Sequence, residues 1–148
     1  GETPSVNAHA TARGLAKVAA MMSMGGKWAG KTILNDEAWQ ALHANPVKAD
    51  MGFCTVGFTQ GGLAHHTKVG ANASVMDQGL NTGREGFYGW MGAGGSLFQW
   101  HPEHQIGFGY VPTALNVLDD LNERGKTYQS EVVKCVQQVE KEGIVEAY

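Results

Sequence analysis

The residues best suited to chemistry form a glycine-rich run that follows a tryptophan. The run reads Trp90, Met91, Gly92, Ala93, Gly94, Gly95 and Ser96. A backbone this bare of side chains can come close to a second backbone or to a bound substrate. Because glycine also costs entropy on folding, its repeated use here needs a return, and we take the run as the candidate site.

Three strands are expected to position this run, all within residues 87–112. The first leads into the run itself. The second covers residues 97–100, which are mostly apolar, and the third places Ile106, Phe108 and Tyr110 in alternation with glycine. An apolar period of two is typical of a strand. Residues 101–104, His-Pro-Glu-His, are predicted to form the hairpin turn between the second and third strands.

Two amphipathic helices are predicted to cover the sheet. In the first, from Thr11 to Met24, apolar residues recur at helical spacing while Arg13 and Lys17 lie on another face. Gly25-Gly26 is expected to end it with a left-handed cap. The second spans residues 127–141 and should pack on the sheet through an apolar stripe. That stripe consists of Val132, Val133, Val136 and Val139.

The remaining segments give weaker signals. Asn35-Asp36 should cap a short helix that ends before Asn45-Pro46. Residues 46–86 look glycine-rich and irregular, with strand-like pieces at 53–58 and 63–66, and we expect lid or surface-loop behaviour there. Residues 115–121 are predicted to form a helical turn or short helix that ends before Gly125. These elements predict an α+β fold, with an antiparallel sheet of three or more strands flanked by helices.

Composition bounds the class of protein. The chain has 148 residues, enough for one core, and its 43% hydrophobic and 17% charged residues argue against disorder. A formal net charge of −3, without a basic run, gives no support for nucleic acid binding. No apolar run approaches the ~20 residues of a membrane helix. Gly92–Ser96 lacks the lysine of a Walker sequence and leads into a strand, so neither a phosphate loop nor a cofactor is expected.

Cysteine and histidine are read here as structural residues. Cys54 and Cys135 lie far apart in sequence and are expected to be two buried, unpaired thiols. Neighbouring residues of a strand point to opposite faces, so the His65-His66 pair should not share an ion. His101 and His104 fall in the predicted hairpin turn, where polar side chains are common. We therefore expect no metal site.

The order and spacing of these features resemble the C-terminal part of the serine β-lactamase and penicillin-binding-protein-like superfamily, which includes the family VIII carboxylesterases. In that family a strand carrying Lys-Thr-Gly, His-x-Gly or Trp-x-Gly precedes a Gly-Gly-Ser-like stretch, a proline-containing hairpin and a strand ending in Tyr-Val. The similar segments here are Trp90–Gly92, Gly94–Ser96, His101–His104, Ile106–Val111 and, nearer the start, Pro4–Gly26. The resemblance implies that residues 1–148 are the C-terminal portion of a β-lactamase/transpeptidase-like domain.

The same resemblance implies roles for the candidate site. The backbone N–H of Ala93 would donate to the oxyanion that forms during acyl transfer. Trp90, Met91, Gly92 and Gly94 would border a small-molecule or peptide acyl substrate lying along the Trp90–Ser96 strand. Because an aromatic ring stands where penicillin-binding enzymes have lysine, an ester, amide or peptide is favoured over a penicillin.

The resemblance also shows which family motifs this chain lacks. The family's nucleophile is the serine of Ser-x-x-Lys, and neither that motif nor Tyr-x-Asn occurs here. Ser5-Val6-Asn7 spells a Ser-x-Asn variant, but it immediately precedes the first helix and is interpreted as helix entry. The implied function is the C-terminal segment of a serine acyl hydrolase, inactive alone, whose partner is the remainder of the parent domain. The alternative is a noncatalytic binding or assembly module of the same fold.

Overall fold

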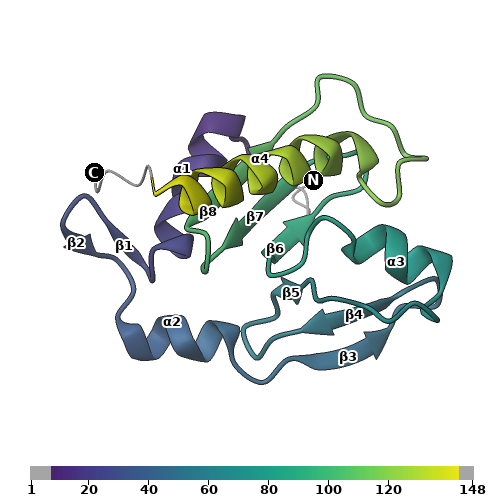
Figure 1. Ribbon diagram of the computed structural model, residues 1–148, viewed down its shortest axis with the longest axis horizontal. Helices are drawn as coiled ribbons and strands as arrows, with labels where there is room; N and C mark the ends of the chain where they lie inside the picture. Colours follow the sequence, from purple (N-terminus) through teal and green to yellow (C-terminus); the bar gives the residue numbers. More distant parts are fainter. Residues whose placement is uncertain (1–7, 144–148) are drawn as a thin grey trace.

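An antiparallel sheet of six strands runs through the structure, a computed structural model that describes residues 8–143 (Figure 1). The strands are β3 (Val47–Asp50), β4 (Thr55–Phe58), β5 (Ala64–His65), β6 (Tyr88–Met91), β7 (Leu97–His101) and β8 (Ile106–Tyr110). They lie side by side in chain order. The predicted α+β class is confirmed, and residues 87–111 contain three antiparallel strands as expected. Ser5-Val6-Asn7 lies outside the described residues.

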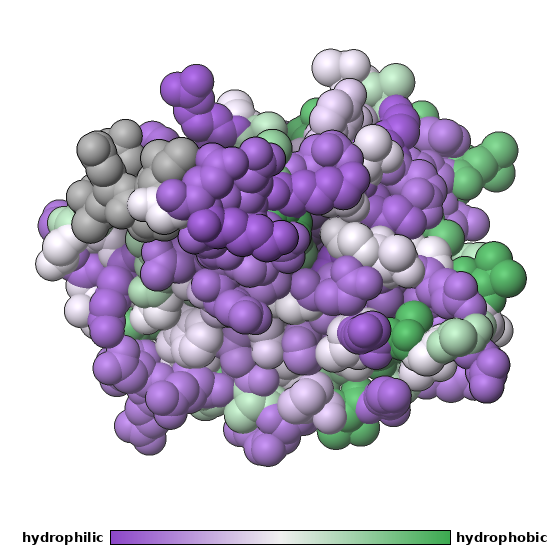
Figure 2. Space-filling model, in the orientation of Figure 1, coloured by the Kyte–Doolittle hydropathy of each residue, from purple (hydrophilic) through white to green (hydrophobic). Residues whose placement is uncertain are grey.

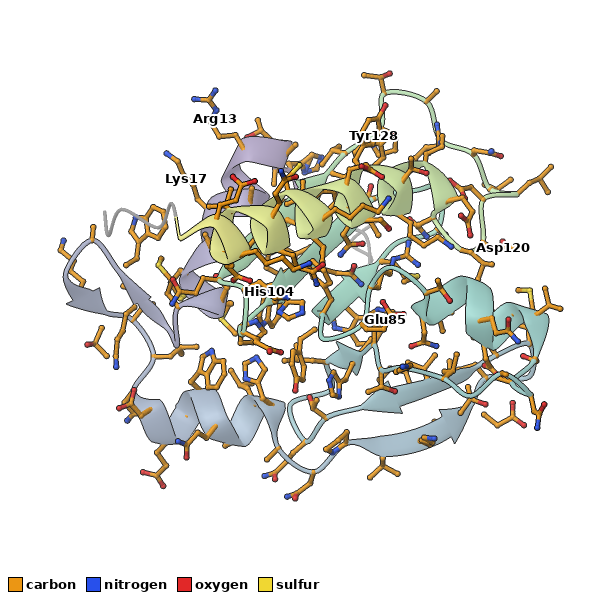
Figure 3. The ribbon with its side chains drawn as sticks, in the orientation of Figure 1. Arg13, Lys17, Glu85, His104, Asp120 and Tyr128 are labelled. Carbon is orange, nitrogen blue, oxygen red and sulfur yellow. The ribbon has the colours of Figure 1, made fainter. Side chains whose placement is uncertain are left out.

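Helix α1 (Ala12–Ser23) packs directly on the backbone of β8. A Cβ atom at Gly107 would lie 2.1 Å from the Ala20 nitrogen, and one at Gly109 would lie 2.6 Å from the Ala12 oxygen. The alternating glycines of this strand are therefore the surface on which α1 rests. Thr11 begins the helix as predicted, since its Oγ1 accepts the Gly14 N–H at 3.1 Å. The predicted polar face is also present, because the labelled basic residues of α1 point away from the sheet (Figure 3).

One apolar core cluster lies on the α1 face of the sheet. Ala19, Met22 and Trp100 are its buried centre. Helix α2 (Asp36–His43) covers the next part of this face, and the indole N–H of Trp39 donates to the Met22 carbonyl at 2.7 Å. The start of α2 is confirmed by its N-cap, in which the Asn35 side chain accepts the Ala38 N–H at 2.7 Å. A separate two-stranded ribbon, β1 (Lys27–Trp28) and β2 (Lys31–Thr32), joins α1 to α2.

Helix α4 (Glu123–Glu142) covers the opposite face and begins earlier than predicted. Gly125, expected to lie beyond a preceding short helix, is in the first turn of α4, where a Cβ atom would lie 2.5 Å from Leu97 Cδ1. Of the helical turn or short helix expected at 115–121, the described chain has turns only: the Asp119 N–H donates to the Asn116 carbonyl at 3.0 Å. There the Asn116 side chain accepts the Leu118 N–H at 3.2 Å, a local turn that competes with helix formation.

The apolar stripe predicted for α4 is only partly buried. Val133 and Val136 are half-buried, whereas Val132 is 36% and Val139 41% exposed. Gln129, which is fully buried, replaces them as the main contact because its amide donates to Gln99 Oε1 of β7 at 2.8 Å. Packing of this helix on the sheet is thus confirmed, but a polar contact anchors it.

Residues 46–86 are more regular than predicted. The strand-like pieces at 53–58 and 63–66 correspond to β4 and β5, while β3 and helix α3 (Val75–Asn81) were not expected. The lid interpretation is therefore wrong for most of the segment. The start of α3 carried a readable signal, because Ser74 Oγ accepts the Asp77 N–H at 3.0 Å in a Ser-x-x-Asp cap.

The face that carries α4 is largely hydrophilic, and apolar groups gather at its right-hand edge, near the loop after β8 and near α3 (Figure 2). The most exposed apolar side chains of these two segments are Val75, Leu115, Val117 and Leu118. No helix within residues 8–143 is both long enough and apolar enough to cross a membrane.

Candidate functional site

The second half of β6 has a free edge. β6 pairs with β7 along its whole length, from Tyr88 to Met91. Its pairing with β5 stops at Gly89, because the chain before β5 turns back toward β4. There the Leu63 carbonyl accepts the Thr59 N–H at 2.9 Å, and the Leu63 N–H donates to the side-chain oxygen Oγ1 of Thr59 at 3.1 Å. Trp90 and Met91 therefore have no strand partner on that side within the described sheet. An extended chain could be added there through backbone hydrogen bonds.

The candidate run is a strand end followed by a closed turn. β6 ends at Met91, so the expected strand from Trp90 to Ser96 is wrong beyond that residue. The Gly92 N–H donates to the Ser96 carbonyl at 2.8 Å, and the Gly95 N–H donates to the Gly92 carbonyl at 3.1 Å. Gly94 and Gly95 have φ angles of +93° and +111°, a region that favours glycine. These positive φ angles explain why glycine occupies both positions.

The Ala93 amide lies at the exposed tip of this turn. Among residues 8–143 its N–H donates to no acceptor, whereas the amides of Gly92 and Gly95 on either side are used within the turn. A backbone N–H without a protein partner is satisfied by water or by a ligand. Within the described residues, the backbone N–H of Ala93 is therefore available as a hydrogen-bond donor.

The other predicted site residues differ in exposure. Trp90 is 47% exposed, Met91 is half-buried and Gly92 is exposed, so all three can be reached from outside. Gly94 is buried, and its carbonyl accepts the Asn116 N–H at 3.3 Å and Arg124 Nη2 at 3.1 Å. Its observed contacts fasten the turn to the loop after β8. Substrate binding by any of these four residues stays a prediction.

An aromatic pair borders the free edge. The rings of Trp90 and Phe58 lie 5.6 Å apart between centroids, tilted by 35°. Phe58 comes from β4, 32 residues earlier in the chain, and is half-buried. Sequence analysis did not connect the two residues, because only the sheet order brings their strands together. The pair provides an apolar surface on β4 and β6, and Trp90 precedes Ala93 by three residues.

No serine of the described chain is hydrogen-bonded to a lysine amine or a histidine ring. The hydroxyl of Ser23 donates to the Ala20 carbonyl at 2.8 Å, and that of Ser130 donates to Lys126 O at 2.9 Å. Ser74 caps α3. These hydroxyls serve helix ends and helix backbones. Within residues 8–143, the site contains a possible oxyanion donor and an edge but no activated nucleophile.

Two hollows of the described structure lie away from the site. Among the described residues, a hollow of about 410 Å³ lies between the β7–β8 turn and α4, lined in part by His104 and Val136. Another of about 350 Å³ lies over β3–β5, with Lys48 and Asp77 among its lining residues. Neither includes Trp90 or the turn after it. We place the site at the free edge because the Ala93 N–H, which has no acceptor among residues 8–143, follows it closely in the chain.

A buried chain of polar side chains lies between the sheet and α4. Arg84 Nε donates to Gln129 Oε1 at 3.2 Å, the Gln129 amide donates to Gln99 Oε1 at 2.8 Å, and Gln99 Nε2 lies 2.9 Å from His66 Nε2. Because the Gln99 oxygen is already an acceptor, its nitrogen donates to His66. Burial, aided by the charge of Arg84, lowers the pKa of His66 to about 3. This chain of contacts could not be predicted from the sequence, since its members are far apart along the polypeptide.

The paired histidines of the sequence serve separate faces of the sheet. The His65 ring stacks on Tyr88 at 4.1 Å between centroids, while His66 joins the buried polar chain. His101 is buried at the end of β7, and His104 Nδ1 lies 3.0 Å from Glu140 Oε1. No group of three or more His, Cys, Asp or Glu side chains within residues 8–143 is placed to hold a metal ion.

The two cysteines are both free but differ in exposure. Cys54 is buried, and its pKa is raised by burial and by the nearby carboxylates of Asp77 and Asp50. A raised pKa disfavours the reactive thiolate. Cys135 is exposed on α4, so the expectation of two buried thiols is wrong for this residue. Its side chain borders the open hollow between α4 and the β7–β8 turn, which leaves the thiol accessible.

Comparisons with known proteins leave this site without a named counterpart. No family model, no curated protein and no solved structure matches the chain. The resemblance to the β-lactamase-like superfamily therefore remains a hypothesis that rests on the motifs and their order.

Proposed function

We propose that this chain forms one wall of a serine acyl-transfer site, in which the Ala93 N–H donates to the oxyanion and the remainder of the parent domain supplies the nucleophile. The observation that carries the proposal is an exposed Ala93 amide, without an acceptor among residues 8–143, next to the free edge of β6. An extended acyl substrate pairing with that edge would place its carbonyl near this donor.

The chemistry follows from what each part would contribute. A serine Oγ attacks the carbonyl carbon, the carbonyl electron pair moves to oxygen, and the resulting oxyanion accepts the Ala93 N–H. The tetrahedral intermediate then collapses and expels the alcohol or amine, leaving an acyl ester on serine that water hydrolyses. One backbone donor of this kind typically lowers the barrier by about 3 kcal/mol. In this proposal the serine and the base that takes its proton come from the remainder of the parent domain.

Trp90 and Phe58 bear on substrate choice. Their rings form an apolar surface at the edge, with Trp90 47% exposed. Since this surface carries no cation, it suits an uncharged acyl or leaving group better than a carboxylate. We expect Trp90→Ala to change the ranking of several esters by kcat/KM while leaving the reaction itself intact.

The experiment uses the whole parent protein, tested by fluorophosphonate labelling and ester hydrolysis. Gly92→Val should lower kcat/KM at least tenfold, because a branched side chain would stand where the substrate backbone approaches. The fold tolerates a Cβ here, whose nearest neighbour would be Ser96 Cβ at 3.8 Å. Gly70→Val is the matched control, since a Cβ at Gly70 would meet nothing within 4 Å. If Gly92→Val left kcat/KM unchanged for several esters, the proposed location of the substrate at the free edge of β6 would be wrong.

A noncatalytic binding or assembly module is the second candidate. It is supported by the exposed apolar side chains of the loop after β8, with Leu115 76%, Val117 73% and Leu118 86% exposed. A parent protein that resists labelling, and whose assembly state changes when Leu115 and Leu118 are replaced by serine, would favour this candidate.

A further inference from the structure

Asn122 is buried against the turn that carries Ala93. It is 2% exposed and has a φ angle of +52°, which asparagine tolerates better than most residues. In the orientation that satisfies hydrogen bonding, its amide nitrogen lies 3.2 Å from each of three carbonyl oxygens. These belong to Gly92, Gly95 and Ser96.

The position of Asn122 is unusual for the residue that precedes a helix. An N-cap asparagine ordinarily uses its side chain to accept an amide of the first turn. Asn122 makes no such bond, since its backbone is left-handed and not extended, and the Glu123 N–H donates to Asp119 Oδ1 at 2.7 Å. The Asn122 side chain is thereby left to the turn after β6.

The backbone of Asn122 is held in place independently. Arg84 is fully buried, and its Nη2 donates to the carbonyls of Leu121 at 2.8 Å and Asn122 at 3.1 Å. Arg84 also anchors to Gln129 of α4. The Asn122 amide is thus mounted on a rigid, buried support, whereas the turn it contacts is exposed at its tip.

The geometry of the peptide bond links Asn122 to Ala93. The Gly92 carbonyl and the Ala93 N–H belong to one planar unit, and in a trans peptide they point in opposite directions. The Gly92 oxygen accepts the Gly95 N–H at 3.1 Å and faces the Asn122 amide at 3.2 Å. Fixing that oxygen toward the buried side turns the Ala93 N–H away from it, toward the exposed side of the turn.

We infer that Asn122 is a positioning residue that aims the Ala93 N–H at the acyl oxygen; this inference rests on the proposed function. Asn122 touches no reacting atom. It acts through the Gly92–Ala93 peptide, and its loss should let that peptide rotate and misdirect the donor.

The first test measures the turn in this 148-residue chain by amide hydrogen exchange. Asn122→Asp keeps the size of the side chain but replaces the donor by a carboxylate that faces three carbonyl oxygens. Exchange of the Gly92 and Gly95 amides should quicken about tenfold, the effect of losing one net hydrogen bond. Asn122→Gly, which keeps the positive φ without the amide, should do the same. Asn116→Asp introduces the same charge nearby and should leave both amides unchanged, since Asn116 uses its oxygen as an acceptor.

The second test measures catalysis in the parent protein, per active site titrated with fluorophosphonate. Both Asn122 variants should lower kcat about tenfold with KM within about twofold, because an oxyanion donor acts in the transition state. A fall only in the titrated fraction, with kcat per site unchanged, would overturn the inference. Unchanged amide exchange at Gly92 and Gly95 in Asn122→Gly would overturn it as well. The Asn122→Gly variant alone serves as the test if Asn122→Asp fails to fold. A wild-type protein that is never labelled would instead refute the proposed function, whatever the exchange rates show.

Discussion

Protonation of His66 should make the stability of this protein depend on pH. Burial and the charge of Arg84 lower the His66 pKa from its ordinary 6.5 to about 3, and the ring is 2% exposed. A proton on Nε2 would also face the Gln99 amide nitrogen at 2.9 Å, donor against donor. The folded protein therefore keeps His66 neutral over a range in which the unfolded chain takes up a proton.

The sign and size follow from that difference. His66 contributes its full stabilisation above pH 6.5, and the contribution is lost as pH falls from 6.5 toward 3. A pH of 5 is about 1.5 units below 6.5, the ordinary pKa that His66 has in the unfolded chain. At ~1.36 kcal/mol per unit, the free energy of unfolding should fall by about 2 kcal/mol between pH 7 and pH 5 through His66 alone.

The assay is urea unfolding of the wild type and of His66→Gln at both pH values. Glutamine can accept from the Gln99 amide but does not titrate, so the variant should lose about 2 kcal/mol less than the wild type over this interval. Burial also lowers the pKa values of His43 and His101, but both proteins share those contributions and the comparison cancels them. Equal losses, within about 0.5 kcal/mol, would refute the assigned environment of His66.

Three further predictions concern other parts of the molecule. Gly107→Val should lower the free energy of unfolding by at least about 3 kcal/mol, because its Cβ would lie 2.1 Å from the Ala20 nitrogen. The control Gly70→Val should change this free energy by less than about 0.5 kcal/mol, and comparable denaturation midpoints for the two variants would contradict the packing of α1 on β8. In the native protein a maleimide should react with Cys135 and not with buried Cys54, whose thiol should become reactive only on unfolding, and mass spectrometry after proteolysis would detect the reverse order. The isolated 148-residue chain should not be labelled by a fluorophosphonate or penicillin probe, and stoichiometric labelling of one serine would show that it holds its own nucleophile.

Local sequence patterns predicted the elements whose signals are local. The alternation of Ile106, Phe108 and Tyr110 with glycine gave β8, and Thr11 and Asn35 gave the starts of α1 and α2. The start of α4 was missed because its first N–H, that of Glu123, donates to the side chain of Asp119, four residues earlier. A side-chain contact of that kind does not appear as periodicity.

The candidate site could be predicted only in part, for a related reason. The run from Trp90 to Gly94 stood out by composition, but the free edge of β6 depends on where β5 stops. The contact of Phe58 with Trp90 depends on the order of strands in the sheet. Arg84 lies in a segment read as irregular, and its role is visible only when α4 is folded over it.

The in-order sheet has a consequence for how the chain reaches its folded state. Every strand of the six-stranded sheet pairs with its neighbours in sequence, and all neighbouring strands except β5 and β6 are joined by short loops that can close early. β5 and β6 are joined by residues 66–87, which include α3. Docking of α1 on β8 is different, because it joins residues 12–23 to residues 106–110. We expect that contact to form late, after the rate-limiting barrier. A φ-value near zero at Ala19, with Ala19→Gly mainly accelerating unfolding, would agree with this order, and a value near one would place the N-terminal helix in the folding nucleus instead.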